Sequence, residues 1–555
     1  MPSYPYSHLF VGPTQTVVTA GPHIQVLGNS SGEIFFSTAT LPEELLAAVV
    51  KSGPIRCAAV DREFEYLLTS GEDKILKVWE VDGLRLLSGR ELPKKPTAVA
   101  FTADAQTILV SDKFGDVFSY PFTYAYVPTP AAKQKQGRDA LASHENPSGG
   151  QLVLGHASPL NAFILTQDEK YIVTADRDEH IRVSWYPKGY NIERYCLGHL
   201  KFVTAIHIPT SDPTSLVSGG GDTVIKIWDW MTGKTKHELR IWETVEPFVA
   251  VKSLKRKRGW GDGEDGDEAQ EGSRRKSRGK REKGKAKEQE KEDQEEDEAE
   301  KEGTGTPARE TESTEEVKPE KVLVIRKISS LDADGGTFIL FSAVGTKALF
   351  CFPFKKDVAP TDVRHFDFGR PVLDFYVVGD GSIFVSLDGE WRNPEAEAEV
   401  GSLPSPMVKI LRVSSGNLSE DLESKKALVN SLNSRSLLPA TPDDLKKLDL
   451  YGDLTSMPKY HSHSLPDADK PEPEGSEASA PIFPIGAPEL SSSKSAPEGG
   501  RKDGVEAKAM ELEADSVGVG VVRKADSEGG GDEPEAKRVK AGEGEKTEDV
   551  VMDEI

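Results

Sequence analysis

Two histidines, His156 and His199, are the candidates for chemistry in this sequence. Each is followed along the chain by a residue with a hydroxyl group and by one with a carboxylate. An enzyme would pair such groups as nucleophile and base, gather them around a metal, or add a glycine loop that holds phosphate. Both histidines occupy the same place in a repeat, which favours a structural role over catalysis or metal binding. The glycine run Ser218–Asp222 lies inside that repeat and indicates a tight strand connection.

Three cysteines, Cys57, Cys196 and Cys351, are too few and too widely spaced for a disulfide framework or a zinc site. The sequence therefore predicts no catalytic residue, no metal site and no cofactor of its own.

Composition divides the chain into folded and unfolded parts. Of its 555 residues, 37% are hydrophobic and 29% are charged, so part of it cannot bury enough apolar area to fold. The formal net charge of −23 argues against a surface that binds nucleic acid throughout, and any RNA contact must be local or supplied by a partner. The first residues lack the order of a signal peptide and no run of about 18 apolar residues occurs, which predicts a soluble intracellular protein without a membrane span.

Changes of composition define four expected regions. Residues 1–253 and 321–460 consist of short β-branched runs closed by Gly, Asp, Pro or Asn, which predict strands and turns. Residues 254–320 and 461–555 are charged and poor in aliphatic residues, so we expect a disordered insertion and a disordered acidic tail, with a smaller polar segment near 131–151. Helical periodicity is confined to "LPEELLAAVV" and to the stretch from "SEDLESKKALVNSL" to "DDLKKLDLYG", a C-terminal helical extension.

Repeats indicate the architecture. The segments "TSGEDKILKVW", "TADRDEHIRVS" and "SGGGDTVIKIW" align, and Asp178 and Asp222 of the last two lie 44 residues apart. A period of about 40 to 45 residues with Gly-His ahead and Trp-Asp behind resembles the WD repeat, four antiparallel strands to a propeller blade. We therefore predict an all-β, seven-bladed WD-repeat β-propeller whose closure draws an N-terminal strand into the last blade.

The WD-repeat resemblance implies a buried chain of hydrogen bonds from the Trp indole through a hydroxyl and the histidine to the turn aspartate. In the best copy these residues are Trp228, Ser218, His199 and Asp222. The copy before it keeps His156 and Thr174 and places Asp178 as the turn aspartate. In the copy "SDKFGDVFSY", Phe114 falls where that aspartate is expected.

A closer resemblance covers about residues 11–460. The stretch "ADRDEHIRVSWYP", continued by "YNIERYCLGHLKFVTAI", together with "SDKFGDVFSY", resembles the WD-repeat, non-catalytic subunit of the eukaryotic tRNA (guanine-N7)-methyltransferase. His180 departs from the family, which has lysine there, and the charged insertion and acidic tail have no counterpart in it.

This resemblance implies a heterodimer with a separate catalytic subunit. The partner would hold S-adenosylmethionine and form N7-methylguanine at position 46 in tRNA, and this chain would meet tRNA through the complex. The charges in and around these motifs, the turn aspartate included, then become the expected interface: Asp112, Lys113, Asp176, Arg177, Asp178, Arg182 and Lys201. We expect Asp176 and Asp178 to hold the arginines in place. A generic WD-repeat scaffold for chromatin or ubiquitin-ligase assemblies is the alternative.

Basic clusters at residues 254–258, 274–287 and 534–540 favour nuclear import, because the acidic residues around each would repel phosphate. A tRNA-tethering arm is the alternative interpretation.

Overall fold

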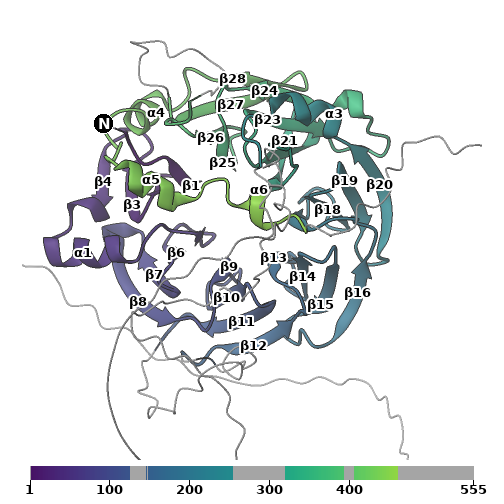
Figure 1. Ribbon diagram of the computed structural model, residues 1–555, viewed down its shortest axis with the longest axis horizontal. Helices are drawn as coiled ribbons and strands as arrows, with labels where there is room; N and C mark the ends of the chain where they lie inside the picture. Colours follow the sequence, from purple (N-terminus) through teal and green to yellow (C-terminus); the bar gives the residue numbers. More distant parts are fainter. Residues whose placement is uncertain (1, 125–145, 147, 254–318, 393–405, 460–555) are drawn as a thin grey trace, which may run out of the picture. The chain divides into compact units, whose positions relative to one another are not determined.

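Seven four-stranded antiparallel sheets make up the fold. The structure is a computed structural model that describes residues 2–124, 146, 148–253, 319–392 and 406–459. Within these residues the sheets stand as blades around a ring (Figure 1). The predicted all-β, seven-bladed WD-repeat propeller is confirmed. The predicted insertion, up to residue 318, and the predicted tail, residues 461–555, lie outside the described residues.

Each blade consists of four strands that follow one another in the sequence. Blades 1 to 4 contain β1 (Tyr6–Val11), β2 (Gln15–Ala20), β3 (His23–Gly28), β4 (Ile34–Ser37); β5 (Cys57–Val60), β6 (Tyr66–Ser70), β7 (Ile75–Glu80), β8 (Arg85–Glu91); β9 (Pro96–Phe101), β10 (Thr107–Asp112), β11 (Asp116–Pro121), β12 (Gln151–Gly155); and β13 (Leu160–Leu165), β14 (Tyr171–Asp176), β15 (Ile181–Trp185), β16 (Ile192–Cys196). The polar segment near residues 131–151 thus lies largely outside the described residues, and its end begins β12.

Blades 5 to 7 contain β17 (Val203–His207), β18 (Ser215–Gly220), β19 (Val224–Asp229), β20 (Lys234–Arg240); β21 (Ile325–Ala333), β22 (Gly336–Ala343), β23 (Ala348–Pro353), β24 (Arg364–Asp367); and β25 (Val372–Val377), β26 (Ile383–Leu387), β27 (Val408–Ser414), β28 (Asn417–Glu420). The helices are α1 (Glu43–Lys51), α3 (Trp242–Val245), α4 (Lys426–Leu432), α5 (Pro442–Leu448) and α6 (Asp453–Ser456). Helices were predicted where α1, α4 and α5 lie, whereas the single turn of α3 was not.

Strand position within a blade explains the sequence patterns. The second strand of blade 5, β18, is buried at all six residues because both faces of its sheet pack against neighbouring blades. The outer strand β20 of the same blade is mostly exposed and carries alternating charges and polar residues. Inner strands therefore appear in the sequence as apolar runs, and outer strands as polar ones.

Ring closure differs from the prediction. The N-terminal strand β1 pairs with β2 inside blade 1, and blade 7 completes itself with its own fourth strand, β28. The expectation that an N-terminal strand joins the last blade was therefore wrong, because no place in that sheet is left open. Blades 1 and 7 instead meet through side chains: Leu9 N donates to Asp374 Oδ2 at 3.1 Å, and Ser386 Oγ donates to the Tyr6 carbonyl at 2.6 Å.

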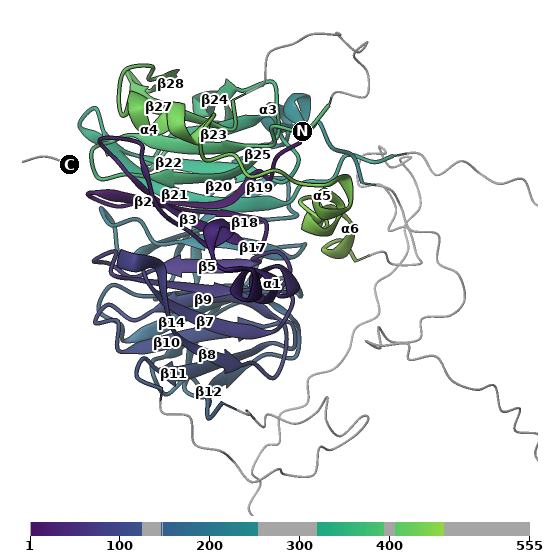
Figure 2. The same cartoon turned by 90° about the vertical axis from the view of Figure 1, so that its left-hand side faces the viewer.

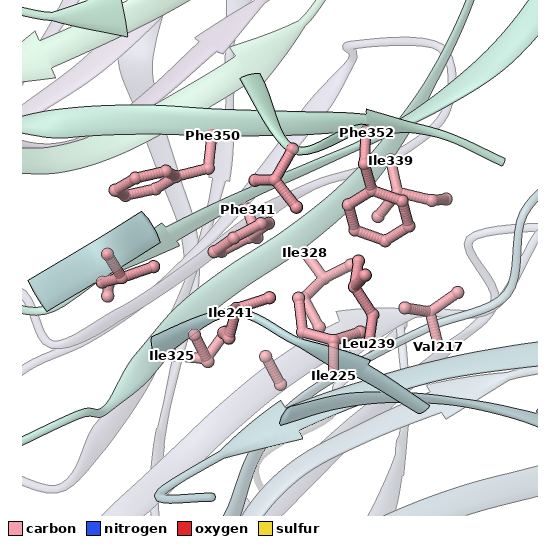
Figure 3. Close-up of a cluster of buried hydrophobic side chains, with 14 of the residues drawn as sticks. Val217, Ile225, Leu239, Ile241, Ile325, Ile328, Ile339, Phe341, Phe350 and Phe352 are labelled. Carbon is pink, nitrogen blue, oxygen red and sulfur yellow. The ribbon is translucent and has the colours of Figure 1, made fainter. Parts of the chain in front are cut away.

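Blades 5 and 6 share the largest apolar core, although the sequence between them contains the long insertion. Figure 3 shows side chains of β18, β19 and β20 facing those of β21, β22 and β23. Phe341 and Phe350 stack with ring centroids 5.1 Å apart, and both are fully buried. At the two ends of the insertion, Ser253 and Glu320 pair with each other in an antiparallel bridge.

The C-terminal extension after α4 lies across the blades on one side of the ring. We call its residues Thr441–Lys459, which include α5 and α6, the strap. Figures 1 and 2 both place α5 and α6 on the same side of the sheets. The side chain of Leu454 is buried against Phe202, Val324 and Val344, so the strap shares a small core with blades 5 and 6.

Candidate partner interface

The turns of blades 3 and 4 that carry the family-like motifs have the same construction. In blade 4, Asp176 Oδ1 accepts hydrogen bonds from Asp178 N at 2.8 Å and His180 N at 3.0 Å. In blade 3, Asp112 Oδ1 accepts from the amides two and four residues further on, at 2.8 and 3.1 Å. Each aspartate ends the second strand of its blade and closes the turn that follows. Both aspartates are therefore part of the fold, and their side chains are buried.

The turn aspartate of blade 4 is Asp176, so the assignment of Asp178 to that place was wrong. His156 Nδ1 lies 2.9 Å from Asp176 Oδ2, and His156 Nε2 lies 2.8 Å from Thr174 Oγ1. Burial lowers the pKa of His156 below its usual value, although the hydrogen bond to Asp176 opposes this. In blade 3 the turn aspartate is likewise two residues earlier than predicted: it is Asp112, and not the position of Phe114. Aligning the blades on the spacing of blade 5 displaced the aspartate by two residues.

Blade 5 contains the hydrogen-bond chain that the repeat implies. His199 Nδ1 lies 2.6 Å from Asp222 Oδ2, and His199 Nε2 lies 2.7 Å from Ser218 Oγ. Trp228 Nε1 donates to the same Ser218 oxygen at 2.7 Å. All four side chains are buried, and the chain leaves none of their polar groups without a partner. These residues therefore hold the blade together.

Arg182 is not a solvated cation but a buried one. Its side chain is on the face opposite Ile181 and Val183, as alternation predicts, yet it is only 7% exposed because blade 3 covers it. Its Nη1 donates to the carbonyl oxygen of Gly155 in blade 3 at 3.0 Å, while its buried Nε has no hydrogen-bond partner among the described residues. Burial lowers the pKa of Arg182, and Tyr195 partly offsets this. Arg182 thus joins blade 4 to blade 3 and leaves one donor unsatisfied.

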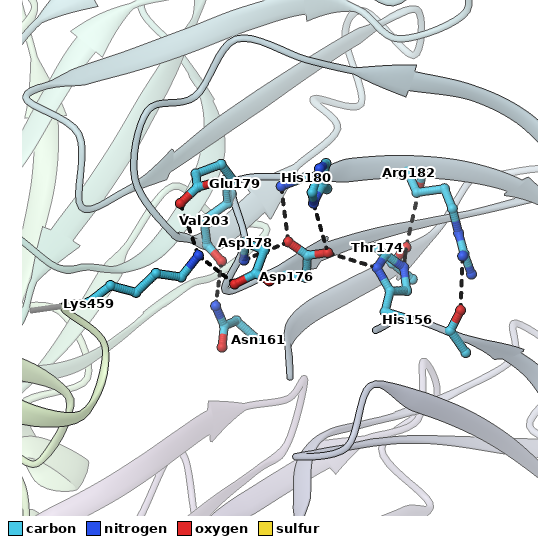
Figure 4. A network of polar contacts seen from close by, with 11 residues as sticks. His156, Asn161, Thr174, Asp176, Asp178, Glu179, His180, Arg182, Val203 and Lys459 are labelled. Atoms are coloured by element: carbon cyan, nitrogen blue, oxygen red, sulfur yellow. Dashed lines mark hydrogen bonds and ion pairs between the residues drawn. The ribbon is translucent and has the colours of Figure 1, made fainter. Parts of the chain in front are cut away.

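Arg177 and Asp178 point away from the blade and meet the strap instead. Lys459 Nζ lies 2.5 Å from Asp178 Oδ1 and 3.2 Å from Glu179 Oε1 (Figure 4). Arg177 Nε donates to the carbonyl oxygen of Met457 at 3.3 Å. The ion pair with Lys459 lowers the pKa of Asp178. Neither aspartate forms the expected ion pair with an arginine: Asp176 binds histidine and backbone, and Asp178 binds Lys459.

The two remaining predicted interface residues, Lys113 and Lys201, are exposed. Lys113 occupies the place in blade 3 that Arg177 occupies in blade 4: its backbone N–H donates to Lys95 O, as that of Arg177 donates to Pro159 O. Lys201 lies in the loop before β17, next to Phe202, whose ring packs against Leu454 of the strap. The predicted set is therefore spread over the turns of blades 3 and 4, strand β15 and the loop before β17. Two of its members, Arg177 and Asp178, contact the strap.

A pocket of about 380 Å³ opens beside the blade 4 turn. Its lining comes from the end of β12 and the loop after it, the turn of blade 4, strands β15 and β16, and the loop after β16: Gly155, His156, Ala157, Ser158, Asp176, Asp178, His180, Arg182, Tyr195 and Leu197. Carboxylates, a guanidinium and exposed apolar atoms meet there. Such a mixed lining suits a protein partner that offers both charges and apolar contacts.

The described residues offer little for catalysis. Burial raises the pKa of each cysteine thiol to about 12, so Cys57, Cys196 and Cys351 are not thiolate nucleophiles. In the described part of the chain, no group of three or more His, Cys, Asp or Glu side chains is placed to hold a metal ion. None of the described helices is long and apolar enough to span a membrane.

The sequence did not predict the strap contacts, nor six lining residues of the pocket, among them Tyr195 and Leu197. Lys459 is 280 residues from Glu179 along the chain, and nothing in the sequence around it distinguishes it from other lysines. Tyr195 and Leu197 do carry a signal: they lie in a stretch of six exposed large apolar residues, Trp185, Tyr190, Ile192, Tyr195, Leu197 and Leu200.

Curated proteins similar to this chain share one name, tRNA (guanine-N(7)-)-methyltransferase non-catalytic subunit. The chain is 33% identical over 250 residues to that of Sclerotinia sclerotiorum, 41% over 207 residues to that of Coccidioides immitis, and 32% over 196 residues to that of Bos taurus. These matches cover 37%, 30% and 35% of this chain and 48%, 40% and 42% of the relatives. The chain thus matches about half the length of these relatives or less.

Likeness to solved structures is weaker. A computationally designed protein, Ika8, aligns over 76% of this chain and 87% of its own with a TM-score of 0.41 and 12% identity. The family model described as "tRNA methyltransferase TRM82 WD40 domain" matches residues 50–150 and 130–402, which is more than half of the chain and includes the turns of blades 3 and 4. The chain therefore belongs to the TRM82 WD40 family.

Proposed function

We propose that this chain is the non-catalytic subunit of a heterodimeric tRNA (guanine-N7)-methyltransferase. In this proposal it binds and stabilises the catalytic subunit, which holds S-adenosylmethionine and forms N7-methylguanine at position 46 in tRNA. Membership of the TRM82 WD40 family and the shared name of the relatives support the proposal. They favour it over the generic scaffold for chromatin or ubiquitin-ligase assemblies.

The structural observation that carries the proposal is the pair of partly exposed charges, Arg177 and Asp178, on the blade 4 turn. Asp176 alone forms the hydrogen bonds that close this turn, so the fold does not require charges at the next two positions. Arg177 and Asp178 nevertheless project there beside the mixed pocket. Charges that take no part in closing the turn, placed on a rigid ring, suit recognition of a partner.

Electrostatics support a division of labour between the subunits. The formal net charge of −23 is unfavourable for a chain that must bind tRNA by itself, because phosphate contacts require cations. A catalytic subunit with a basic surface would supply most of the RNA contacts. This chain would then act by positioning that subunit.

The test is purification of the tagged chain from its own cells, followed by mass spectrometry and an assay of methyl transfer to tRNA. We expect a stoichiometric methyltransferase that is active with this chain and feeble without it. Recovery of chromatin or ubiquitin-ligase components without a methyltransferase would refute the proposal and favour the scaffold.

We also propose that the protein resides in the nucleus, on the evidence of its three basic clusters. Those clusters lie outside the described residues. A fluorescent fusion that lacks all three should lose its nuclear concentration, and retention in the nucleus would refute import through them.

A further inference from the structure

The last described residues of the strap contact the turn that carries the proposed interface. Of the strap contacts, those nearest its C-terminal end involve blade 4: Arg177 Nε to Met457 O, and Lys459 Nζ to Asp178 and Glu179. In the described structure, the chain itself therefore occupies two of the residues that a partner is expected to bind.

The middle of the strap is anchored much more firmly than its end. Leu454 is 2% exposed within its apolar cluster, and its carbonyl oxygen accepts a hydrogen bond from Ser253 Oγ at 2.9 Å. The Tyr451 hydroxyl donates to Asp388 Oδ2 at 2.6 Å. The Lys459 side chain, by contrast, is 29% exposed and pairs with an Asp178 side chain that is 45% exposed. Partly exposed ion pairs contribute little to stability, so the end can detach while the middle stays bound.

We propose that Asp178 and Glu179 form an ammonium-binding surface, filled by Lys459 in the free chain, on which a lysine or arginine of the catalytic subunit replaces Lys459. This inference rests on the proposed function. The geometry also indicates a second element of the partner. Release of the strap end frees Arg177 from the Met457 carbonyl, and a partner carboxylate can then bind that guanidinium.

Occupation of this surface by Lys459 has a measurable consequence for the affinity of the chain for the catalytic subunit. When only a fraction of a protein is competent to bind, the apparent dissociation constant rises by the reciprocal of that fraction. A strap end that blocks the surface most of the time therefore weakens binding of the partner by a modest factor. Removing Lys459 removes the competition and leaves the surface itself unchanged.

The test compares Lys459→Ala with Lys446→Ala in the full chain. Lys446 is a strap lysine with an 81% exposed side chain, and its ion pair, with Asp443, lies within α5. Titration calorimetry with the purified catalytic subunit should show binding about 2- to 5-fold tighter for Lys459→Ala and unchanged for Lys446→Ala. Unchanged or weaker binding by Lys459→Ala would overturn the proposal, since the lysine would then be a bystander or part of the interface.

Hydrogen exchange of the wild-type chain gives an independent readout. In the described structure the Met457 amide donates to the Asp453 carbonyl oxygen at 3.1 Å. Adding the catalytic subunit should accelerate exchange at Met457 and leave the Leu454 amide protected. Slower exchange at Met457 would mean that the strap end is held in the complex, and the proposal would fail while the proposed function stands. If neither the wild-type chain nor either variant forms a complex, the proposed function itself fails.

Discussion

At the scale of single residues, adjacent charges in one turn have separate tasks. Asp176 is buried and binds a histidine and two backbone amides, so it belongs to the fold. Arg177 and Asp178 follow it directly, and their side chains contact the Met457 carbonyl oxygen and Lys459 of the strap rather than the amides that close the turn. Substitutions within this turn should therefore separate stability from binding.

We expect Arg177→Leu to weaken binding of the catalytic subunit at least about tenfold, because a directional cation at an interface is a frequent hot spot. The melting temperature of the Arg177→Leu variant should stay within about 2 °C of that of the wild type. Calorimetric titration and thermal unfolding measure the two quantities. Lys170→Leu is the matched control: Lys170 is 73% exposed, and the hairpin that carries it is at the other end of blade 4. Equal affinity of the two variants would exclude Arg177 from the interface.

His199→Ala should act on stability instead. The substitution leaves the Asp222 carboxylate buried with only the Leu200 amide as partner, at 3.1 Å, and removes the acceptor of Ser218. We expect a loss of about 2 to 3 kcal/mol in the free energy of unfolding, measured by urea denaturation. His180→Ala is the control, because this histidine also faces a turn aspartate but is half exposed. Its Nδ1 lies 3.4 Å from Asp176 Oδ2. A loss no greater than that of the control would contradict the buried network.

At the scale of elements, close approach of backbones decides which strand residues can change. The last residue of β18, Gly220, faces Val203 across the ladder, and the amide of Gly221 donates to the Phe202 carbonyl oxygen at 2.9 Å. A Cβ atom on Gly220 would overlap that carbonyl oxygen and lie 2.8 Å from Val203 Cα. The glycine run that resembles a phosphate loop is thus a tight strand contact.

Gly220→Ala should destabilise the protein by about 2 kcal/mol or more, because backbone atoms of β17 must move. Gly89→Ala in β8 should change stability by less than about 0.5 kcal/mol, since its Cβ would meet only Ile75 Cγ2 at 3.5 Å. Urea unfolding of both variants measures the difference. Equal stability of the two would show that β17 and β18 do not approach as closely as described.

At the scale of the whole molecule, backbone hydrogen bonds join the two ends of the insertion between blades 5 and 6. Ser253 N donates to Glu320 O at 2.8 Å, and Glu320 N donates to Ser253 O at 2.9 Å. The ends of the insertion are therefore held together, and the blades on either side share a continuous apolar core.

Replacing residues 254–318 with eight Gly and Ser residues should leave the melting temperature equal or slightly higher. Shortening a loop about eightfold lowers its closure entropy by about 2 kcal/mol at most. Thermal unfolding of the shortened protein is the measurement. A fall of more than about 5 °C would show that the removed residues stabilise the ring.

The repeats were enough to predict the number of blades and the hydrogen-bond chain around Trp228, because a periodic pattern can be recognised within one chain. The family was predicted from the motif around Asp176. The sequence pattern misplaced the turn aspartate of blade 4. The interval from the hydroxyl residue, Thr174 in blade 4, to the turn aspartate differs by two residues between blades 4 and 5, and the fold tolerates both intervals. Three features became visible in the folded chain alone: the burial of Arg182 by blade 3, the closure of blade 7 by its own strand, and the contact of Lys459 with Asp178. Each of these depends on residues distant in sequence or on a competition between possible strands, which local patterns do not encode.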